Sequence, residues 1–287
     1  MFERIIKRAE TVIEALPYLR KFFGKVIVIK YGGNAMIDKD LKAKVMQDVA
    51  LLKYVGMHPV LIHGGGPDIS KELKKNKLET KFQEGLRVTD EKTMEVVEKV
   101  LSRINSKIVF LLNKNGRIAK GLSGNKGKII KAKKHIFYRN KQKIDLGFVG
   151  DVQAIDAKML KAIINKGKIP VISSIGVDSK GNVYNINADS VAAEIAAALS
   201  ATKFILLTNV RGVLDKKDKL VSMINAPKVR RLIKNGTISG GMIPKVRCGL
   251  LALKGGVDTV HIVDGRIPHA ILLEIFTDIG IGTMVER

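Results

Sequence analysis

The chain has 287 residues and carries 51 basic against 27 acidic side chains, a formal net charge of +24. This length and a hydrophobic fraction of 46% suffice for one large or two modest α/β domains and exclude a disordered chain. No apolar stretch is long enough to span a bilayer and no signal-type apolar block opens the sequence, so we expect a cytoplasmic protein with no membrane partner. The single cysteine, Cys248, excludes intrachain disulfides and Cys-cluster metal sites.

The positive charge invites a nucleic-acid interpretation. Most lysines, however, are scattered over presumed helix faces with few aromatic side chains between them. The densest cluster, at 126–143, is the strongest argument for such binding, and its simpler explanation is a solvated hairpin region. We therefore predict no nucleic-acid partner.

Apolar residues recur at helical spacing over the first sixteen residues and predict an amphipathic helix that Pro17 ends. Strands and helices then alternate, which predicts a parallel, doubly wound α/β sheet. The first half should contain a strand at 26–30, a helix at 41–55, a strand at 60–63, a helix from 67, a helix at 91–104 and a strand at 108–112.

The segment 116–151 is rich in Gly and Lys and is typical of hairpins at the edge of a sheet. The second half should contain a helix at 157–165, a strand at 169–173, a helix at 188–199, a strand at 204–208, helices at 226–233 and 242–253, and a strand at 259–263. The turn-forming run at 178–181 indicates a division into two lobes, loosely at 176–186.

Glycines follow the first two strands. In His63-Gly64-Gly65-Gly66-Pro67 they allow backbone N–H groups to converge on an anion at the start of a helix, where Pro67 is well suited. The alternative is a tight strand-to-helix turn without a ligand. The pair Gly32-Gly33 is by itself equally consistent with a plain turn.

Charged residues stand beside these glycines. Lys30 ends a buried strand and needs an anion or an acidic partner there. Lys245 follows a Gly-Gly loop, and its alternative role is a solvated lysine. Asp189 is either the N-cap of an Ala-rich helix or an acid that orients the two lysines. Arg87 can grip a carboxylate with two hydrogen bonds, or it is a surface loop arginine.

Other chemistries lack their motifs. The segment 121–128 is superficially like a P-loop, but its glycine spacing is wrong and Ile129 replaces the required Ser or Thr. No G-x-G-x-x-G follows the first strand. The five histidines show no metal-ligand spacing and no nucleophile–base pattern is present, so we expect no metal held by the protein alone.

Six segments, in this order, closely resemble the amino-acid kinase family. They are Lys-Tyr-Gly-Gly-Asn at 30–34, His-Gly-Gly-Gly-Pro at 63–67, Gly-Leu-Arg-Val-Thr at 85–89, Asp-Leu-Gly-Phe-Val-Gly at 145–150, Asn-Ile-Asn-Ala-Asp at 185–189 and Ser-Gly-Gly-Met-Ile-Pro-Lys at 239–245. The resemblance extends from about 25 to 282. It implies a three-layer α/β sandwich around a mostly parallel sheet, with an N-terminal lobe at 21–180 for an acyl substrate and a C-terminal lobe at 181–287 for Mg-ATP.

Within this family the chain is most similar to the branch that phosphorylates the side-chain carboxylate of N-acetyl-L-glutamate with ATP. This resemblance implies that Lys30 and Lys245 neutralise the transferred phosphoryl group and that Asp189 holds both lysines. It also implies phosphate binding by Gly33, Gly64 and Gly65, substrate binding by Gly64, Gly65, Arg87 and Asn185, and Mg²⁺ carried by the nucleotide. Because the acceptor carboxylate is already ionised, the reaction needs no general base.

The segment 1–20 resembles the N-terminal helix of arginine-inhibited members, in which such helices join dimers into a hexamer, a trimer of dimers. By the same resemblance, arginine would act as an inhibitor at His261, Glu274 and Gly280. The alternative is a helix that packs on its own lobe.

The chain departs from the family pattern at Asn209, where an acid is common, so we assign no nucleotide contact there. A kinase for acetylaminoadipate stays open as an alternative, because one methylene changes binding by only about 1–3 kcal/mol. Carbamate and uridylate kinases fit the Arg87 and Asn185 segments less well. A non-catalytic arginine or nucleotide sensor is disfavoured by the presence of Lys30, Asp189 and Lys245.

Overall fold

The computed structural model describes residues 2–32, 36, 38–83, 85–114, 116–123, 127–139, 142–278 and 280–287. The described helices are α1 (Phe2–Glu14), α2 (Leu16–Phe22), α3 (Lys39–Tyr54), α4 (Gly66–Lys75), α5 (Glu91–Asn113), α6 (Ala157–Asn165), α7 (Ala188–Ala198), α8 (Ala226–Lys234), α9 (Met242–Lys254) and α10 (Ala270–Ile275).

The main sheet has eight strands in the described residues. In spatial order they are β14 (Met223–Asn225), β16 (Thr283–Glu286), β15 (Thr259–Asp264), β13 (Lys203–Thr208), β1 (Val26–Tyr31), β2 (His58–His63), β10 (Ile169–Ser173) and β5 (Ala119–Leu122). The pairing is parallel except between β15 and β16. The predicted mostly parallel sheet is confirmed.

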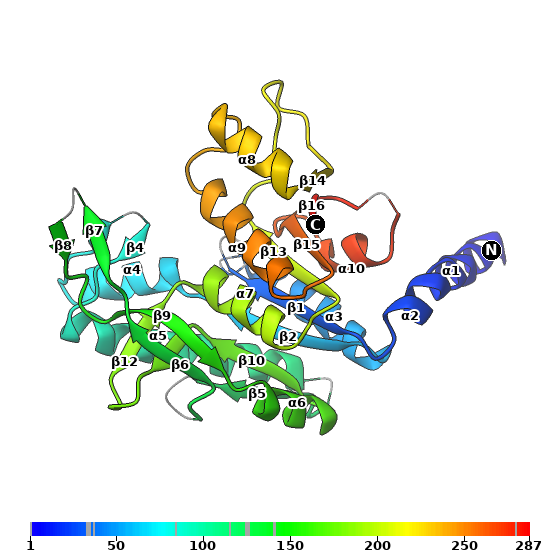
Figure 1. The fold of residues 1–287 in the computed structure, drawn as a ribbon. Coiled ribbons are helices and arrows are strands. Elements are labelled where there is room, and N and C mark those ends of the chain that lie inside the picture. The colour runs from blue at the N-terminus through cyan, green and yellow to red at the C-terminus, as the bar shows by residue number, and fades with distance from the viewer. Residues whose placement is uncertain are drawn as a thin grey trace.

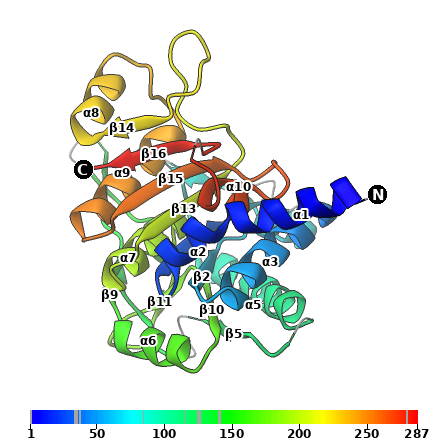
Figure 2. The same cartoon turned by 90° about the vertical axis from the view of Figure 1, so that its right-hand side faces the viewer.

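The strands are buried on both faces, which explains their continuous apolar runs. In β1, Val28 joins a cluster on one face, whereas Ile27 and Ile29 join a cluster on the other. Helices α7, α9 and α6 cover the first face, and α3, α5 and α10 cover the second (Figures 1 and 2). These are the three layers that the resemblance implied.

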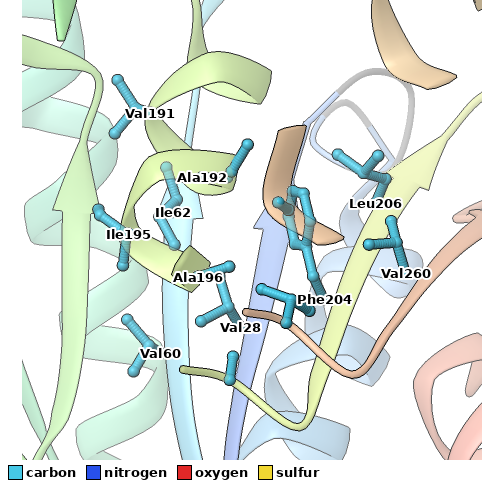
Figure 3. Close-up of a cluster of buried hydrophobic side chains, with 14 of the residues drawn as sticks. Val28, Val60, Ile62, Val191, Ala192, Ile195, Ala196, Phe204, Leu206 and Val260 are labelled. Atoms are coloured by element: carbon cyan, nitrogen blue, oxygen red, sulfur yellow. The ribbon is translucent and has the colours of Figure 1, made fainter. Parts of the chain in front are cut away.

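Helix α7 packs closely on the centre of the sheet because its buried face is rich in alanine. Figure 3 shows Val191, Ala192, Ile195 and Ala196 of this helix against Val28 and other strand side chains. This close packing brings the first turn of α7 near the carboxyl ends of the central strands.

A smaller closed sheet consists of β11 (Ile175–Val177), β12 (Val183–Ile186), β9 (Val149–Ile155) and β6 (Ile130–Lys134). Two short hairpins, β3 (Phe82–Gln83) with β4 (Leu86–Arg87) and β7 (Phe137–Arg139) with β8 (Gln142–Ile144), complete the strands. The prediction of edge hairpins over 116–151 is therefore only partly right, since β5 is a parallel edge strand and β6 and β9 belong to the closed sheet.

The predicted strand at 108–112 is wrong. Helix α5 continues without a break to Asn113, and its buried residues Leu101, Asn105, Ile108 and Leu112 lie three or four positions apart. The apolar run is therefore the buried side of a helix, because no Gly or Pro interrupts the helical period there.

Helix α1 extends away from the rest of the chain (Figures 1 and 2). Its apolar side chains are largely exposed, from 52% for Ile5 to 80% for Phe2. The helix breaks at Ala15, and Pro17 stands in the first turn of α2 rather than simply ending a helix. None of the described helices has both the length and the apolar composition needed to cross a membrane.

The burial of the central strands predicts that two leucines contribute very differently to the free energy of unfolding. Leu206 of β13 is fully buried, whereas Leu251 of α9 is 46% exposed. We expect Leu206→Ala to lower the free energy of unfolding by about 2–5 kcal/mol, because it leaves a cavity between sheet and helices. The matched Leu251→Ala should cost less than about 1 kcal/mol. Urea denaturation measures both values, and equal losses would contradict this account of the core.

Candidate active site

A cavity of about 290 Å³ opens where β1 and β2 end. Its walls include Lys30, Gly64, Gly65, Arg87, Asn185 and Asp189, which come from segments far apart in the sequence. The carboxyl ends of parallel strands are where ligands of such sheets bind. Six of the residues selected from the sequence therefore meet in one place.

Asp189 stands between two lysines. Lys245 Nζ donates to Asp189 Oδ2 over 2.9 Å, and Lys30 Nζ lies 3.0 Å from Oδ1. Each carboxylate oxygen of Asp189 thus faces its own ammonium group. The three side chains are only 11–19% exposed. The cluster carries one net positive charge in a place that water hardly reaches, and it therefore favours an anion.

The ionised form of Asp189 is strongly favoured. Burial alone would raise its pKa, but the charges of Lys30 and Lys245 outweigh burial and lower the pKa to about 2. Asp189 therefore carries its charge at every pH at which the protein is expected to work.

Local structure explains how these residues meet. Asn187, not Asp189, caps α7, because its side chain accepts from the N–H groups of Asp189 and Ser190. The N-cap alternative for Asp189 is therefore wrong. Lys30 reaches the carboxylate by passing over Gly32, where an added Cβ would lie 2.6 Å from its Nζ. The glycine leaves the space that the lysine head occupies.

The glycine run 64–66 forms the opposite wall at the start of α4. The Gly65 carbonyl accepts from Ile69 N–H, and the Gly66 carbonyl accepts from Arg87. Gly64 N–H makes a long contact of 3.4 Å with the Tyr31 carbonyl. In the described part of the chain, the N–H groups of Gly65 and Gly66 have no acceptor. They are thus available to an anion at a helix N-terminus.

Arg87 is a buried residue of β4, only 7% exposed, so its interpretation as a surface loop arginine is wrong. Its Nη2 donates to the Gly66 carbonyl and to Ser70 Oγ, and its guanidinium lies 4.7 Å from the centre of the Phe82 ring. Burial lowers its pKa from the ordinary value. Its Nη1 is buried without a hydrogen-bond partner among the described residues. A carboxylate would satisfy this nitrogen.

Asn185 of β12 faces the same cavity, and its side chain donates to Thr89 Oγ1 over 3.3 Å. The predicted phosphate-binding residue Gly33 lies outside the described residues. No group of three or more His, Cys, Asp or Glu side chains is arranged to hold a metal ion within the described ranges.

The profile of the amino acid kinase family matches residues 25–264, most of the chain. The chain belongs to the amino acid kinase family. It is 52% identical over 287 residues to "Acetylglutamate kinase" of Caldicellulosiruptor bescii, a match that covers 99% of this chain and 98% of that protein. The full-length similarity that the six segments indicated is thereby confirmed.

Two solved structures of N-acetylglutamate synthase from Neisseria gonorrhoeae are also similar. One, complexed with coenzyme A and N-acetyl-glutamate, superposes with a TM-score of 0.86 at 25% identity, covering 97% of this chain and 63% of the synthase chain. The other, with coenzyme A and L-arginine, gives a TM-score of 0.84 at 25% identity, covering 97% and 65%. The chain thus spans about two thirds of that longer protein and shares its amino acid kinase fold.

A second cavity of about 330 Å³ is lined by all three predicted effector residues, His261, Glu274 and Gly280. His261 Nδ1 lies 2.6 Å from Glu274 Oε1, and Glu274 Oε2 accepts from Ile281 N–H. Gly280 has a φ of +60°, and an added Cβ would lie 3.1 Å from the Glu274 carboxylate. Only glycine fits there without strain.

Sequence reasoning missed residues in both cavities. Lys203 Nζ lies 3.0 Å from His261 Nε2, and burial lowers its pKa to about 8 although the charge of Glu274 acts in the opposite direction. Lys203 is the first residue of β13, and nothing beside it in the sequence distinguishes it from a solvated lysine at the start of a strand. In the first cavity, Ser174 and Phe82 were also missed, because neither stands in a glycine-rich or charged motif.

The pairing of Asp189 predicts a pH-dependent effect of Asp189→Asn. At pH 7 the amide leaves two buried ammonium groups without a carboxylate, and we expect the free energy of unfolding to fall by about 3–5 kcal/mol. The folded-state pKa of about 2 lies below the ordinary 3.8, so the ionised pair stabilises the fold fully above about pH 4 and loses this effect as the pH falls toward 2.

The difference between wild type and variant should therefore shrink over that acidic range. Urea denaturation at pH 7, 4 and 3 measures it, with Asp218→Asn at an exposed turn as control. A difference that stays constant with pH would be incompatible with the proposed charge state.

Proposed function

We propose that the protein transfers the γ-phosphoryl group of ATP to the side-chain carboxylate of N-acetyl-L-glutamate, in the second step of arginine synthesis. The observation that carries this proposal is the buried cluster of Lys30, Asp189 and Lys245. It concentrates positive charge beside a loop in which two N–H groups have no acceptor among the described residues. The name of the 52% identical relative supports the choice of substrate.

The reaction requires the protein only to position the two substrates and to stabilise negative charge. The acceptor carboxylate is ionised at neutral pH and attacks phosphorus without a general base. Lys30 and Lys245 approach the phosphoryl group from β1 and α9 and stabilise the negative charge that shifts onto its oxygens. Asp189 holds both ammonium groups at fixed positions and is not itself a proton acceptor, since it already pairs with them.

The glycine loop supplies neutral donors to the same group. Gly64 and Gly65 of this loop, together with Gly33 from the separate Gly32-Gly33 pair, would bind phosphate oxygens through their backbone N–H groups. Mg²⁺ would be carried chiefly by the nucleotide phosphates and would neutralise part of their charge. The donor set at the cavity, two ammonium groups and backbone N–H groups, fits a polyanion that brings its own cation.

Arg87 and Asn185 account for recognition of the acyl substrate. Arg87 Nη1, which has no hydrogen-bond partner in the part of the chain that the structure describes, suits a carboxylate of N-acetyl-L-glutamate, because burial makes an unsatisfied guanidinium donor costly. Asn185 offers an amide to the acetylated amino group. We assign acyl-substrate binding to the lobe at 21–180, with Asn185 added from the lobe at 181–287, and Mg-ATP binding to the lobe at 181–287, with residues 204–212 near the nucleotide.

Loss of either lysine should remove most of the activity. We expect Lys30→Ala and Lys245→Ala each to lower kcat by roughly 100-fold or more, because each removes a charge that stabilises the transition state. A coupled ADP-release assay measures this, with exposed Lys161→Ala as the matched control.

The same assay tests the acceptor with N-acetylglutamate, N-acetylaminoadipate, free glutamate and carbamate. We expect the highest kcat/KM with N-acetylglutamate. ADP release by Lys30→Ala at the wild-type rate would show that Lys30 has no catalytic role. A preference for N-acetylaminoadipate would show that the proposed substrate is wrong.

We also propose that arginine inhibits the enzyme at the second cavity and that α1 joins dimers into a hexamer, a trimer of dimers. Glu274 provides a buried carboxylate for a cationic ligand, and the similar synthase has been crystallised with L-arginine. Helix α2 contributes Tyr18 and Phe22 to this cavity. Helix α1 extends away from the cavity, and its apolar face is exposed. A helix of 13 residues is marginal alone in water, so α1 needs a partner.

Regulation and assembly can be tested separately. Millimolar arginine should inhibit the wild type, and Glu274→Gln should raise the half-inhibitory concentration by about tenfold or more, because the amide loses the charge that attracts arginine. The control is Glu79→Gln, because the Glu79 side chain is 78% exposed.

Light scattering should give six copies for the wild type and fewer for Ile6→Asp on the apolar face of α1. Unchanged inhibition of Glu274→Gln by arginine would refute the arginine site. An unchanged mass of Ile6→Asp would refute the assembly through α1.

A further inference from the structure

His63 is a buried residue that the proposed chemistry leaves without a role. It ends β2, is fully inaccessible to solvent and stands directly before the glycine loop. Each ring nitrogen has its own partner: Nδ1 lies 3.1 Å from the Gly64 carbonyl oxygen, and Nε2 lies 3.0 Å from Asn105 Nδ2.

Asn105 determines which nitrogen of His63 carries the proton. The same Asn105 Nδ2 lies 2.9 Å from the Val171 carbonyl and 3.4 Å from the Leu122 carbonyl. Carbonyl oxygens only accept, so the Asn105 atom that faces them must be the amide nitrogen. His63 Nε2 must then accept from it, which leaves the proton on Nδ1. Burial lowers the pKa of His63 to about 4, so the ring is neutral at neutral pH.

The proton on Nδ1 fixes the direction of a peptide group. His63 Nδ1–H donates to the Gly64 carbonyl, and in a trans peptide the Gly65 N–H points away from that carbonyl. This N–H is one of the two in the loop without an acceptor in the described part of the chain. The loop cannot shift toward α5 as compensation, since a Cβ at Gly65 would already lie 2.8 Å from Leu101 and 2.9 Å from Ile104.

We propose that His63, held in its Nδ1–H form by Asn105, is a positioning residue for phosphoryl transfer. It orients the Gly64–Gly65 peptide so that Gly65 N–H faces the transferred phosphoryl group. The inference rests on the proposed function, because the direction of this donor matters to catalysis only if a phosphoryl group binds there. His63 neither touches the substrate nor exchanges a proton in the reaction.

Two amide substitutions separate this role from simple packing. In His63→Asn the side-chain amide nitrogen can occupy the place of Nδ1 and still donate to Gly64. In His63→Gln the longer side chain places its amide near Nε2 and Asn105, and the donor to Gly64 is lost. Both variants remove the ring from the core and should lose similar stability in urea denaturation.

We expect His63→Asn to retain kcat within about threefold of the wild type, and His63→Gln to lower kcat by about tenfold or more. KM for N-acetylglutamate should change less than about threefold in both, because Arg87 and Asn185 are untouched. Neutron crystallography of the wild type should locate the deuteron on Nδ1.

Each outcome decides something. Equal kcat losses in the two variants, or a deuteron on Nε2, would show that His63 only fills the core and would overturn the inference while the kinase function stands. A wild type that releases no ADP with any acceptor would overturn the proposed function and this inference with it.

Discussion

The structure depends on one buried carboxylate held between two ammonium groups. Asp189, Lys30 and Lys245 come from α7, β1 and α9, and their charges do not cancel. Burying such a cluster costs several kcal/mol that a chain selected only for stability would avoid with apolar side chains. The excess positive charge is therefore a functional feature of the site. The surrounding elements hold it in place, because the alanine-rich face of α7 lets this helix approach the sheet and α7 packs on α9.

Much of the fold followed from the sequence because parallel strands buried on both faces have a distinct pattern. The runs at 26–30, 60–63, 169–173 and 204–208 were all predicted, since each is apolar without alternation and is bounded by turn residues. The run at 108–112 has the same composition and was assigned wrongly. Its neighbours Leu101 and Asn105 continue a helical period, and only the length of α5 decides between the two patterns. The short strands β14 and β16 carry too few residues for any pattern to appear.

The candidate site was predictable where a residue violates a local rule. Lys30 stands at the end of a buried strand and therefore requires a partner, whereas the role of Arg87 was predicted only from the resemblance of its segment to the family. The roles of Asn105 and Lys203 were not predictable, because their partners lie 42 and 58 residues away in the chain and meet them only after folding. An asparagine in the middle of a helix has no local signature that distinguishes a solvent-exposed side chain from one that joins three strands.

The two cavities lie toward opposite ends of the same pair of strands. In the register of β1 and β13, Ile27 lies beside Lys203 and Lys30 lies beside Leu206, a separation of about 10 Å along the strands. Central strands packed on both faces deform little. Under the proposed regulation by arginine, a signal would therefore need a connection other than these strands.

Helix α10 offers such a connection. It carries Glu274, and His269 before its first turn lies 2.6 Å from the buried carboxylate of Asp48 in α3. Helix α3 begins seven residues after Gly32, next to which the Lys30 head lies. A shift of α10 that accompanies a ligand at Glu274 would act on α3 through this buried contact. The contact between α10 and α3, rather than strain in the sheet, is thus the link that the described residues offer between the second cavity and the helices on that face of the sheet.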